Sequence, residues 1–129
     1  MRLLLDTHIW LWSLIEPARL GKRTREELLD PKNELWISPI STWEALTLQD
    51  KGRVYLAADV NEWITQNTVP FREAPLTHEI AVAAHLLRLS QRDPADRFLA
   101  ATAKVLGLTL VTADAGLLGL GEIATLANR

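Results

Sequence analysis

Four acidic residues of this chain stand where their carboxylates could act together. Asp6 and Asp114 each follow a short apolar run, whereas Glu44 and Asp96 each follow a proline that is typical of a helix start. Carboxylates that are brought together repel one another, and a divalent cation relieves that repulsion. Hard oxygen ligands without cysteine suit magnesium or manganese. The four residues therefore predict a metal site, provided that the fold makes them converge.

The apolar runs before Asp6 and Asp114 predict two strands of a parallel sheet. The run 3–5 is continuous, which is typical of a strand buried on both faces. In open α/β sheets, ligands bind at the carboxyl ends of the strands, and both acidic residues fall there. All the predicted strands are, in order, 3–5, 35–37, 71–74, 108–111 and the edge strand 122–126.

Helix signals alternate with these strands. They are, in order, an apolar helix after Asp6 to about Leu14, Thr24 with Glu27 as a capping box, Ser38 before Pro39, Asp59 with Glu62, Thr77, and Asp93 before Pro94 with Gly107 at the end. The helix at Thr24 could also begin a few residues earlier. A chain of 129 residues favours one domain, residues 1–129. The alternation predicts an α/β fold with a central parallel sheet and helices on both faces.

Each acidic residue also has a purely local explanation. Asp6 and Asp114 could cap the helices that follow them, and Asp93 is expected to cap its own. Asp96 could favour the helix dipole, and Glu44 could close a capping box if its helix began after Pro39 rather than at it. Each motif is weak alone, so their order and context carry the prediction.

The composition narrows the class of protein. Hydrophobic residues make up 48% of the chain and charged residues 23%, which is globular composition. There are no cysteines, so disulfides and cysteine zinc sites are excluded. The formal net charge of -2 argues against a strongly basic nucleic-acid binder. No apolar run has membrane-spanning length and the start does not resemble a signal peptide, so a cytoplasmic protein without a membrane partner is expected.

The ordered motifs resemble those of PIN-domain ribonucleases, specifically the VapC-like toxins of type II toxin–antitoxin pairs. The matching segments are Leu3-Leu4-Leu5-Asp6-Thr7-His8, Ser41-Thr42-Trp43-Glu44, Asp93-Pro94-Ala95-Asp96-Arg97-Phe98-Leu99-Ala100-Ala101 and Leu110-Val111-Thr112-Ala113-Asp114. The resemblance covers essentially the whole chain and implies a PIN-like domain over residues 1–129.

The resemblance implies a divalent-metal-dependent endoribonuclease that hydrolyses RNA phosphodiester bonds with Mg²⁺, or with Mn²⁺. Asp6, Glu44, Asp96 and Asp114 would form its acidic site. Asp6 and Asp96 are expected to ligate metal directly, and Asp114 to ligate a second ion or to act through water. Glu44 is expected to orient or deprotonate the attacking water, and Thr112 to hydrogen-bond behind the ligands. The implied partners are an RNA substrate, a cognate antitoxin and a second copy of the chain.

Two other functions stay open. A PIN fold could hold metal or a partner without cleaving RNA. Alternatively, an α/β phosphoryl-transfer enzyme could use Asp6 as its nucleophile. Haloacid-dehalogenase-like enzymes of that kind usually have a second aspartate two residues on, where this chain has His8. No glycine-rich phosphate loop is present, which disfavours nucleotide-driven chemistry.

The supporting residues are assigned less firmly. His8 is expected to be structural or to support the site, and His78 and His85 to be structural. Arg97 could pair with a carboxylate or reach the substrate, and both alternatives stay open. Trp10 is a candidate for the edge of a groove, because it stands close to Asp6 in the sequence.

Two surface features are candidates for contacts with partners. The basic cluster in 19–25 could be a solvated helix face or could contact RNA phosphates. The antitoxin is expected to bind across the helices of 24–29 and 38–51, close to the acidic site. Trp43 lies on the second of these helices and is a further groove candidate.

Overall fold

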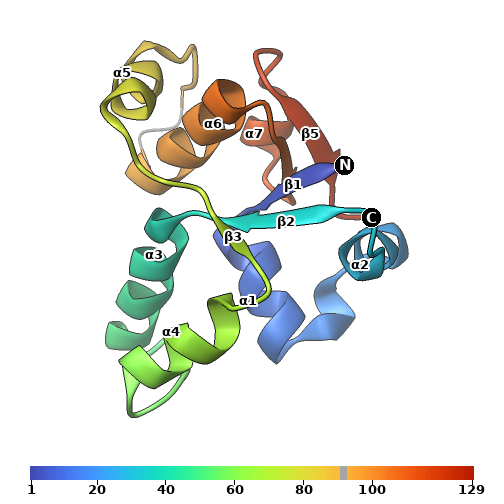
Figure 1. Ribbon diagram of the computed structural model, residues 1–129. Coiled ribbons are helices and arrows are strands. Elements are labelled where there is room, and N and C mark those ends of the chain that lie inside the picture. Colours follow the sequence, from blue (N-terminus) through green and yellow to red (C-terminus); the bar gives the residue numbers. More distant parts are fainter. Residues whose placement is uncertain (91–92) are drawn as a thin grey trace.

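The computed structural model describes residues 1–90 and 93–129 and shows a five-stranded, all-parallel sheet (Figure 1). The strands lie in the order β3-β2-β1-β4-β5. Their bounds are β1 Arg2–Leu5, β2 Glu34–Ile37, β3 Arg72–Glu73, β4 Thr109–Thr112 and β5 Ala124–Ala127. The sequence prediction of a central first strand is confirmed, because β1 pairs with β2 on one side and β4 on the other.

Helices connect the strands and cover both faces of the sheet, as predicted (Figure 1). Their bounds are α1 Thr7–Ile15, the 3-10 helix η1 Pro17–Arg19, α2 Lys22–Leu29, α3 Pro39–Asp50, α4 Val60–Thr68, α5 His78–Leu86, α6 Pro94–Leu106 and α7 Ala115–Leu118. Among the described residues, no helix combines the length and the apolar character needed to span a membrane.

Successive side chains of β1 enter two different cores because a strand alternates its faces. Leu4 packs with residues of α5, α6 and α7, whereas Leu3 and Leu5 pack with residues of α1 and α3. All three leucines are at most 1% exposed. Complete burial on both faces explains why β1 reads as a continuous apolar run, and it fixes the point where the chain emerges at Asp6.

Most of the predicted helix starts are confirmed by side-chain caps. Ser38 accepts a hydrogen bond from the backbone N–H of Ile40 at 3.1 Å. The other confirmed caps are Asp59, Thr77 and Asp93. Gly107 ends α6 in the left-handed conformation, with φ of 67°, which a glycine adopts without strain.

The capping box predicted at Thr24 is wrong. Helix α2 begins at Lys22 after Gly21, and Thr24 is buried inside it. The Thr24 hydroxyl accepts a hydrogen bond from the backbone N–H of Arg129 at 3.2 Å. The hydroxyl thus bonds to a residue 105 positions away in sequence instead of capping its own helix. The capping box that would use Glu44 is also wrong, because α3 begins at Pro39 and Ser38 caps it.

Candidate functional site

All four predicted acidic residues line one cavity of about 340 Å³. Asp6 leaves the end of β1, and Asp114 follows β4, its neighbour in the sheet. Glu44 comes from α3 and Asp96 from the first turn of α6. The complete lining is Asp6, His8, Trp12, Glu44, Asp93, Asp96, Ala113 and Asp114. The fold thus brings together carboxylates from four elements that are far apart in sequence.

Asp6 is held in place by the neighbouring strand. Its backbone N–H donates to the carbonyl of Val111 at 3.0 Å, so the β1–β4 pairing continues through this residue. The Thr112 hydroxyl donates to Asp6 Oδ2 at 2.7 Å and accepts the backbone N–H of Asp114 at 3.0 Å. Thr112 therefore hydrogen-bonds behind the cavity as predicted. Asp6 makes no side-chain cap to α1, so its local explanation is wrong.

Asp93 and Asp114 each have a local role beside their place in the cavity. Asp93 Oδ1 accepts the backbone N–H of Ala95 at 2.9 Å and caps α6, as predicted. Asp114 Oδ1 accepts the backbone N–H of Leu117 at 3.1 Å and caps α7. Capping occupies one oxygen of each carboxylate, and both side chains still line the cavity.

Burial and mutual repulsion disfavour the ionised form of the carboxyl groups in this cavity. Burial is the largest effect that raises the pKa of Asp96 to about 7. Repulsion from neighbouring carboxylates adds to the rise, in decreasing order from Asp6, Asp93, Asp114 and Glu44. Burial likewise raises the pKa of Asp6, and the Thr112 hydrogen bond offsets part of that rise. A cation in the cavity would remove the cause of the repulsion.

Glu44 is half-buried, and two hydroxyl groups lie behind it. Burial raises the pKa of Glu44, and a hydrogen bond from the Thr7 hydroxyl lowers it in part. The Thr7 and Ser41 hydroxyls are joined by a buried hydrogen bond of 2.9 Å, which ties α1 to α3. Sequence reasoning missed the role of Thr7. Its only signal was its place directly after Asp6, whereas its contact spans 34 residues.

Aromatic residues at the cavity differ from those predicted. Trp12 lines the cavity, whereas Trp10 is fully buried in the core against Trp63. Trp43 is 60% exposed and is not among the lining residues. The helical repeat of α1 explains the error, because Trp12 shares its side with His8 at spacing i, i+4, and Trp10 does not. The His8 and Trp12 rings lie 6.0 Å apart.

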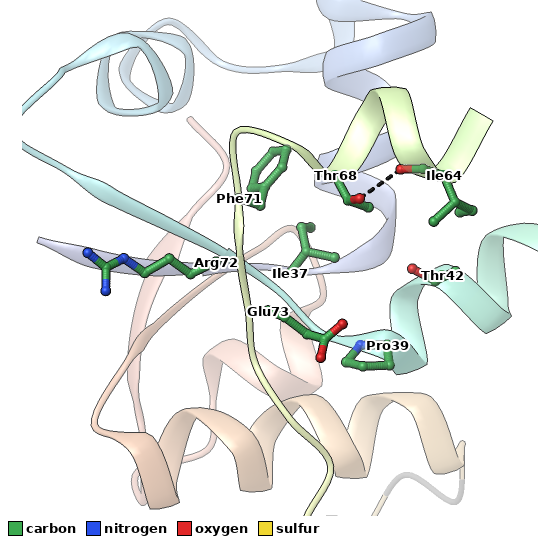
Figure 2. A pocket seen from close by; sticks show the side chains of 8 residues that line it. All are labelled: Ile37, Pro39, Thr42, Ile64, Thr68, Phe71, Arg72 and Glu73. Atoms are coloured by element: carbon green, nitrogen blue, oxygen red, sulfur yellow. Dashed lines mark hydrogen bonds between the residues drawn. The ribbon is translucent and has the colours of Figure 1, made fainter. Parts of the chain in front are cut away.

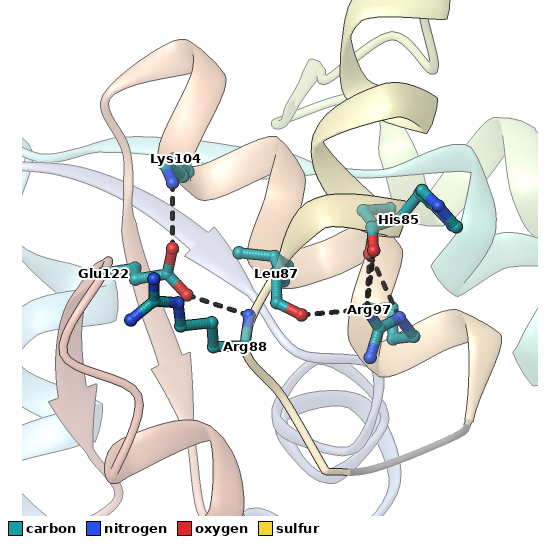
Figure 3. A network of polar contacts seen from close by, with 7 residues as sticks. His85, Leu87, Arg88, Arg97, Lys104 and Glu122 are labelled. Carbon is teal, nitrogen blue, oxygen red and sulfur yellow. Dashed lines mark hydrogen bonds and ion pairs between the residues drawn. The ribbon is translucent and has the colours of Figure 1, made fainter.

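Arg97 extends toward the end of α5 (Figure 3). Its guanidinium donates to the carbonyl oxygens of Ala84 at 2.8 and 3.0 Å, of Leu89 at 2.8 Å and of Leu87 at 3.1 Å. Neither alternative left open by the sequence describes these bonds, since they hold backbone rather than a carboxylate or a substrate. His78 and His85 do not line the acidic cavity, as expected of structural residues.

The donors at the cavity suit a hard divalent cation. The ionisable side chains that line the cavity are carboxylates and the exposed His8. Carboxylate oxygens favour magnesium or manganese. Within residues 1–90 and 93–129, no three His, Asp or Glu side chains are already gathered tightly enough to enclose an ion.

A second cavity of about 310 Å³ lies between α3, α4 and β3 (Figure 2). Figure 2 shows Arg72 extending away from it, while Glu73 turns toward Pro39. Much of its remaining lining is apolar, including Ile37, Ile64 and Phe71, so it offers no group of carboxylates. The acidic cavity is therefore the better candidate for chemistry.

Comparison with known proteins decides the family. A family profile described as "PIN domain" matches residues 3–122. The chain belongs to the PIN-domain family. A curated relative of this PIN domain is Ribonuclease VapC22 of Mycobacterium tuberculosis (strain ATCC 25618 / H37Rv). The two are 36% identical over 112 residues, which cover 86% of this chain and 85% of the relative.

Solved structures share the fold of this PIN domain. VapBC2 from Rickettsia felis, bound to a promoter DNA fragment, contains a chain that superposes with a TM-score of 0.74 and 17% identity, covering 100% of both chains. A toxin–antitoxin complex from Klebsiella pneumoniae gives a TM-score of 0.67 and 20% identity, covering 98% of this chain and 97% of the other. The resemblance read from the sequence and the predicted α/β fold are thus both confirmed.

Proposed function

We propose that this protein is a divalent-metal-dependent endoribonuclease and the toxin of a toxin–antitoxin pair. The observation that carries the proposal is the cavity lined by Asp6, Glu44, Asp96 and Asp114, where burial and then the neighbouring carboxylates raise the pKa of Asp96 to about 7. The relative VapC22 is named a ribonuclease, which supports RNA as the substrate.

Asp6, Asp96 and Asp114 would hold Mg²⁺, with Mn²⁺ as an alternative. They come from the end of β1, from α6 and from the end of β4, so three separate elements would each supply a carboxylate to the ion. When bound, the cation supplies charge stabilisation for the phosphate and helps to activate a water. Thr112 keeps Asp6 oriented through its 2.7 Å hydrogen bond.

Glu44 acts as the proton acceptor in this proposal. Its raised pKa makes it a better base than an ordinary glutamate, while it still ionises easily enough to take a proton from water. The Thr7 side chain lies beside this carboxylate and lowers its pKa in part. Asp93 holds the first turn of α6, and with it Asp96, through its cap on Ala95.

A protein antitoxin is the proposed partner, and the cytoplasm the proposed location. The solved structure from Klebsiella pneumoniae is described as a toxin–antitoxin complex, which supports a partner of that kind here. The expected antitoxin site, across α2 and α3 and close to the acidic cavity, stays part of this proposal, and α1 packs against both α3 and η1.

The decisive experiment replaces single carboxylates and measures stability and cleavage together. In Asp96→Asn, one repelling charge is removed, so the metal-free protein should be at least as stable as the parent. Mg²⁺ stabilises the parent by about 2.7 kcal/mol at a concentration about 100-fold above its Kd, and this gain should shrink in the variant. RNA cleavage should fall by orders of magnitude.

Asp93→Asn is the matched control, since asparagine caps a helix about as well as aspartate. It should keep cleavage and most of the response to Mg²⁺, whereas Asp6→Asn should behave like Asp96→Asn. Thermal melts with and without Mg²⁺ measure the stability of all three variants, and an RNA cleavage assay measures their activity. An Asp96→Asn protein that is less stable yet cleaves RNA at the parental rate would refute the site. A parent that binds Mg²⁺ without cleaving any RNA would favour the non-cleaving alternative.

A further inference from the structure

A groove of about 220 Å³ adjoins the acidic cavity and shares two residues with it. His8 and Trp12 line both, so the two spaces lie next to each other along one side of α1. The groove runs between α1 and the end of α3, and the segment after α3 closes it. The acidic cavity therefore has a neighbouring groove with a different set of side chains.

The floor of the groove is apolar and its rim carries two arginines. Leu11 and Leu48 contribute to the floor, and Arg19 and Arg53 line the rim. The Arg19 guanidinium carbon lies 4.3 Å from the centre of the Trp12 ring, a cation–π contact that holds the charge beside the shared wall. Glu16 also lines the groove, and it is exposed, so water screens its charge.

We propose that this groove binds the RNA strand immediately beside the phosphodiester that is cleaved. Arg19 and Arg53 contact backbone phosphates of the flanking nucleotides, and the apolar floor receives the sugar or base edge between them. The inference rests on the proposed ribonuclease function and names the part of the chain that holds the substrate. A strand that places one phosphate at the acidic cavity must carry its next phosphates along a neighbouring surface, and this groove adjoins the cavity at His8 and Trp12.

Charge complementarity favours RNA over a protein segment. An acidic cavity alone repels a polyanion, so phosphates on either side of the cleaved bond need nearby cations. The chain has a formal net charge of -2, and local placement of arginine must therefore supply them. The sequence cluster 19–25 is divided by the fold, since Arg19 lies on η1 at the groove while Arg25 lies on α2.

The test measures RNA binding as a function of salt for three variants. Arg53→Gln and Arg19→Gln each remove one proposed phosphate contact, and Arg25→Gln removes the same charge from outside the groove. The probe is a fluorescently labelled single-stranded RNA of mixed sequence, titrated in Mg²⁺-free buffer from about 50 to about 200 mM salt. Removing one contact should weaken binding several-fold and make the slope of log K against log salt less negative by about 0.7.

The expected result is a reduced slope in Arg53→Gln and Arg19→Gln and a parental slope in Arg25→Gln. The thermal shift produced by Mg²⁺ should stay parental in all three, because none of these side chains lines the acidic cavity. Parental affinity and slope in both groove variants would overturn the proposal, and a groove for a protein helix would give that result. Mg²⁺-dependent cleavage by the parent is measured separately, so a failed subsite is distinguished from a failed ribonuclease assignment.

Discussion

Asp96 connects the electrostatics of the site to the stability of the protein. Burial, and after it repulsion from neighbouring carboxylates, disfavours its charge in the folded state, whereas the unfolded chain restores a pKa near 3.8. A carboxyl whose pKa is raised by folding is easier to ionise once unfolded, so each ionised Asp96 pulls the equilibrium toward unfolding. The site is therefore built at a cost in stability that a bound cation offsets.

We expect the metal-free protein to lose stability as the pH rises from about 4 to about 7, the interval between the unfolded and folded pKa of Asp96. Above that interval the penalty is complete and constant, and below it the penalty is absent. Urea unfolding in a chelator, at pH values on both sides of this interval, measures the effect. Asp96→Asn should flatten the dependence, and an equally steep dependence in that variant would assign it to other groups.

Thr112 is expected to be far more sensitive than a buried threonine elsewhere. Thr112→Val removes the donor to Asp6 and the acceptor for the Asp114 N–H, which should cost about 1–3 kcal/mol. Thr102 is the matched control, since it is equally buried and its hydroxyl bonds only to the carbonyl of Phe98, at 2.6 Å. Thr102→Val should cost less than about 1 kcal/mol in the same urea titration. Equal costs would mean that Thr112 contributes packing alone.

At the scale of elements, the Arg97 side chain of α6 joins that helix to the backbone at the end of α5. Arg97 satisfies carbonyls at the end of α5 that the helix itself leaves without partners (Figure 3). Lys104 and Glu122 form a separate and more exposed ion pair of 3.1 Å in the same region. Exposed ion pairs of this kind contribute little to stability, so we expect the Arg97 hydrogen bonds to stabilise the protein more than this pair does.

We expect Arg97→Met to destabilise the protein by about 2 kcal/mol or more, because several charge-assisted hydrogen bonds are lost at once. Amide hydrogen exchange should accelerate at the end of α5, where Leu87 donates to Ala83. Arg97→Lys should recover only part of the loss, since an ammonium lacks the planar fork. Lys104→Met is the control and should cost between about 0 and 1 kcal/mol.

Elements were predictable from the sequence where the signal is local. Ser38 and Asp93 bond to N–H groups two residues ahead, and Gly107 needs only its own backbone, so short motifs report them correctly. Thr24 has a local motif but a distant partner, Arg129, and local rules cannot weigh the two. Asp6 and Asp114 were found for a similarly local reason, because a short apolar run in the sequence ends just before each of them.

Features of the site that depend on packing angles could not be read from the sequence. Whether Trp10 or Trp12 faces the cavity depends on the rotation of α1 against the sheet. The meeting of Arg19 and Arg53 in one groove depends on where the segment after α3 returns to α1. Periodicity defines the faces of a helix, and only the tertiary contacts decide what each face meets.

At the scale of the whole molecule, we expect a homodimer. Val82 is 59% exposed and Leu86 69% exposed, one turn apart on the outer side of α5, which is an apolar pair that a second copy could cover. Sedimentation at micromolar concentration should show a species heavier than the 14.5 kDa monomer. Val82→Glu should weaken association, whereas Leu29→Glu, at an 82% exposed position on α2, should not. A monomer at every concentration tested would contradict the prediction.

The pairing of β1 with β4 also limits when the site can form during synthesis of the chain. The hydrogen bond between Thr112 and Asp6 joins residues 106 positions apart, and the intervening chain must be synthesised before the two strands can meet. At about 5–20 residues per second, that interval lasts about 5–20 s. During that time the ribosome holds a nascent chain whose acidic residues are still scattered. A ribonuclease assembled in this order cannot bring its acidic residues together until the chain has been synthesised past Thr112 and Asp114.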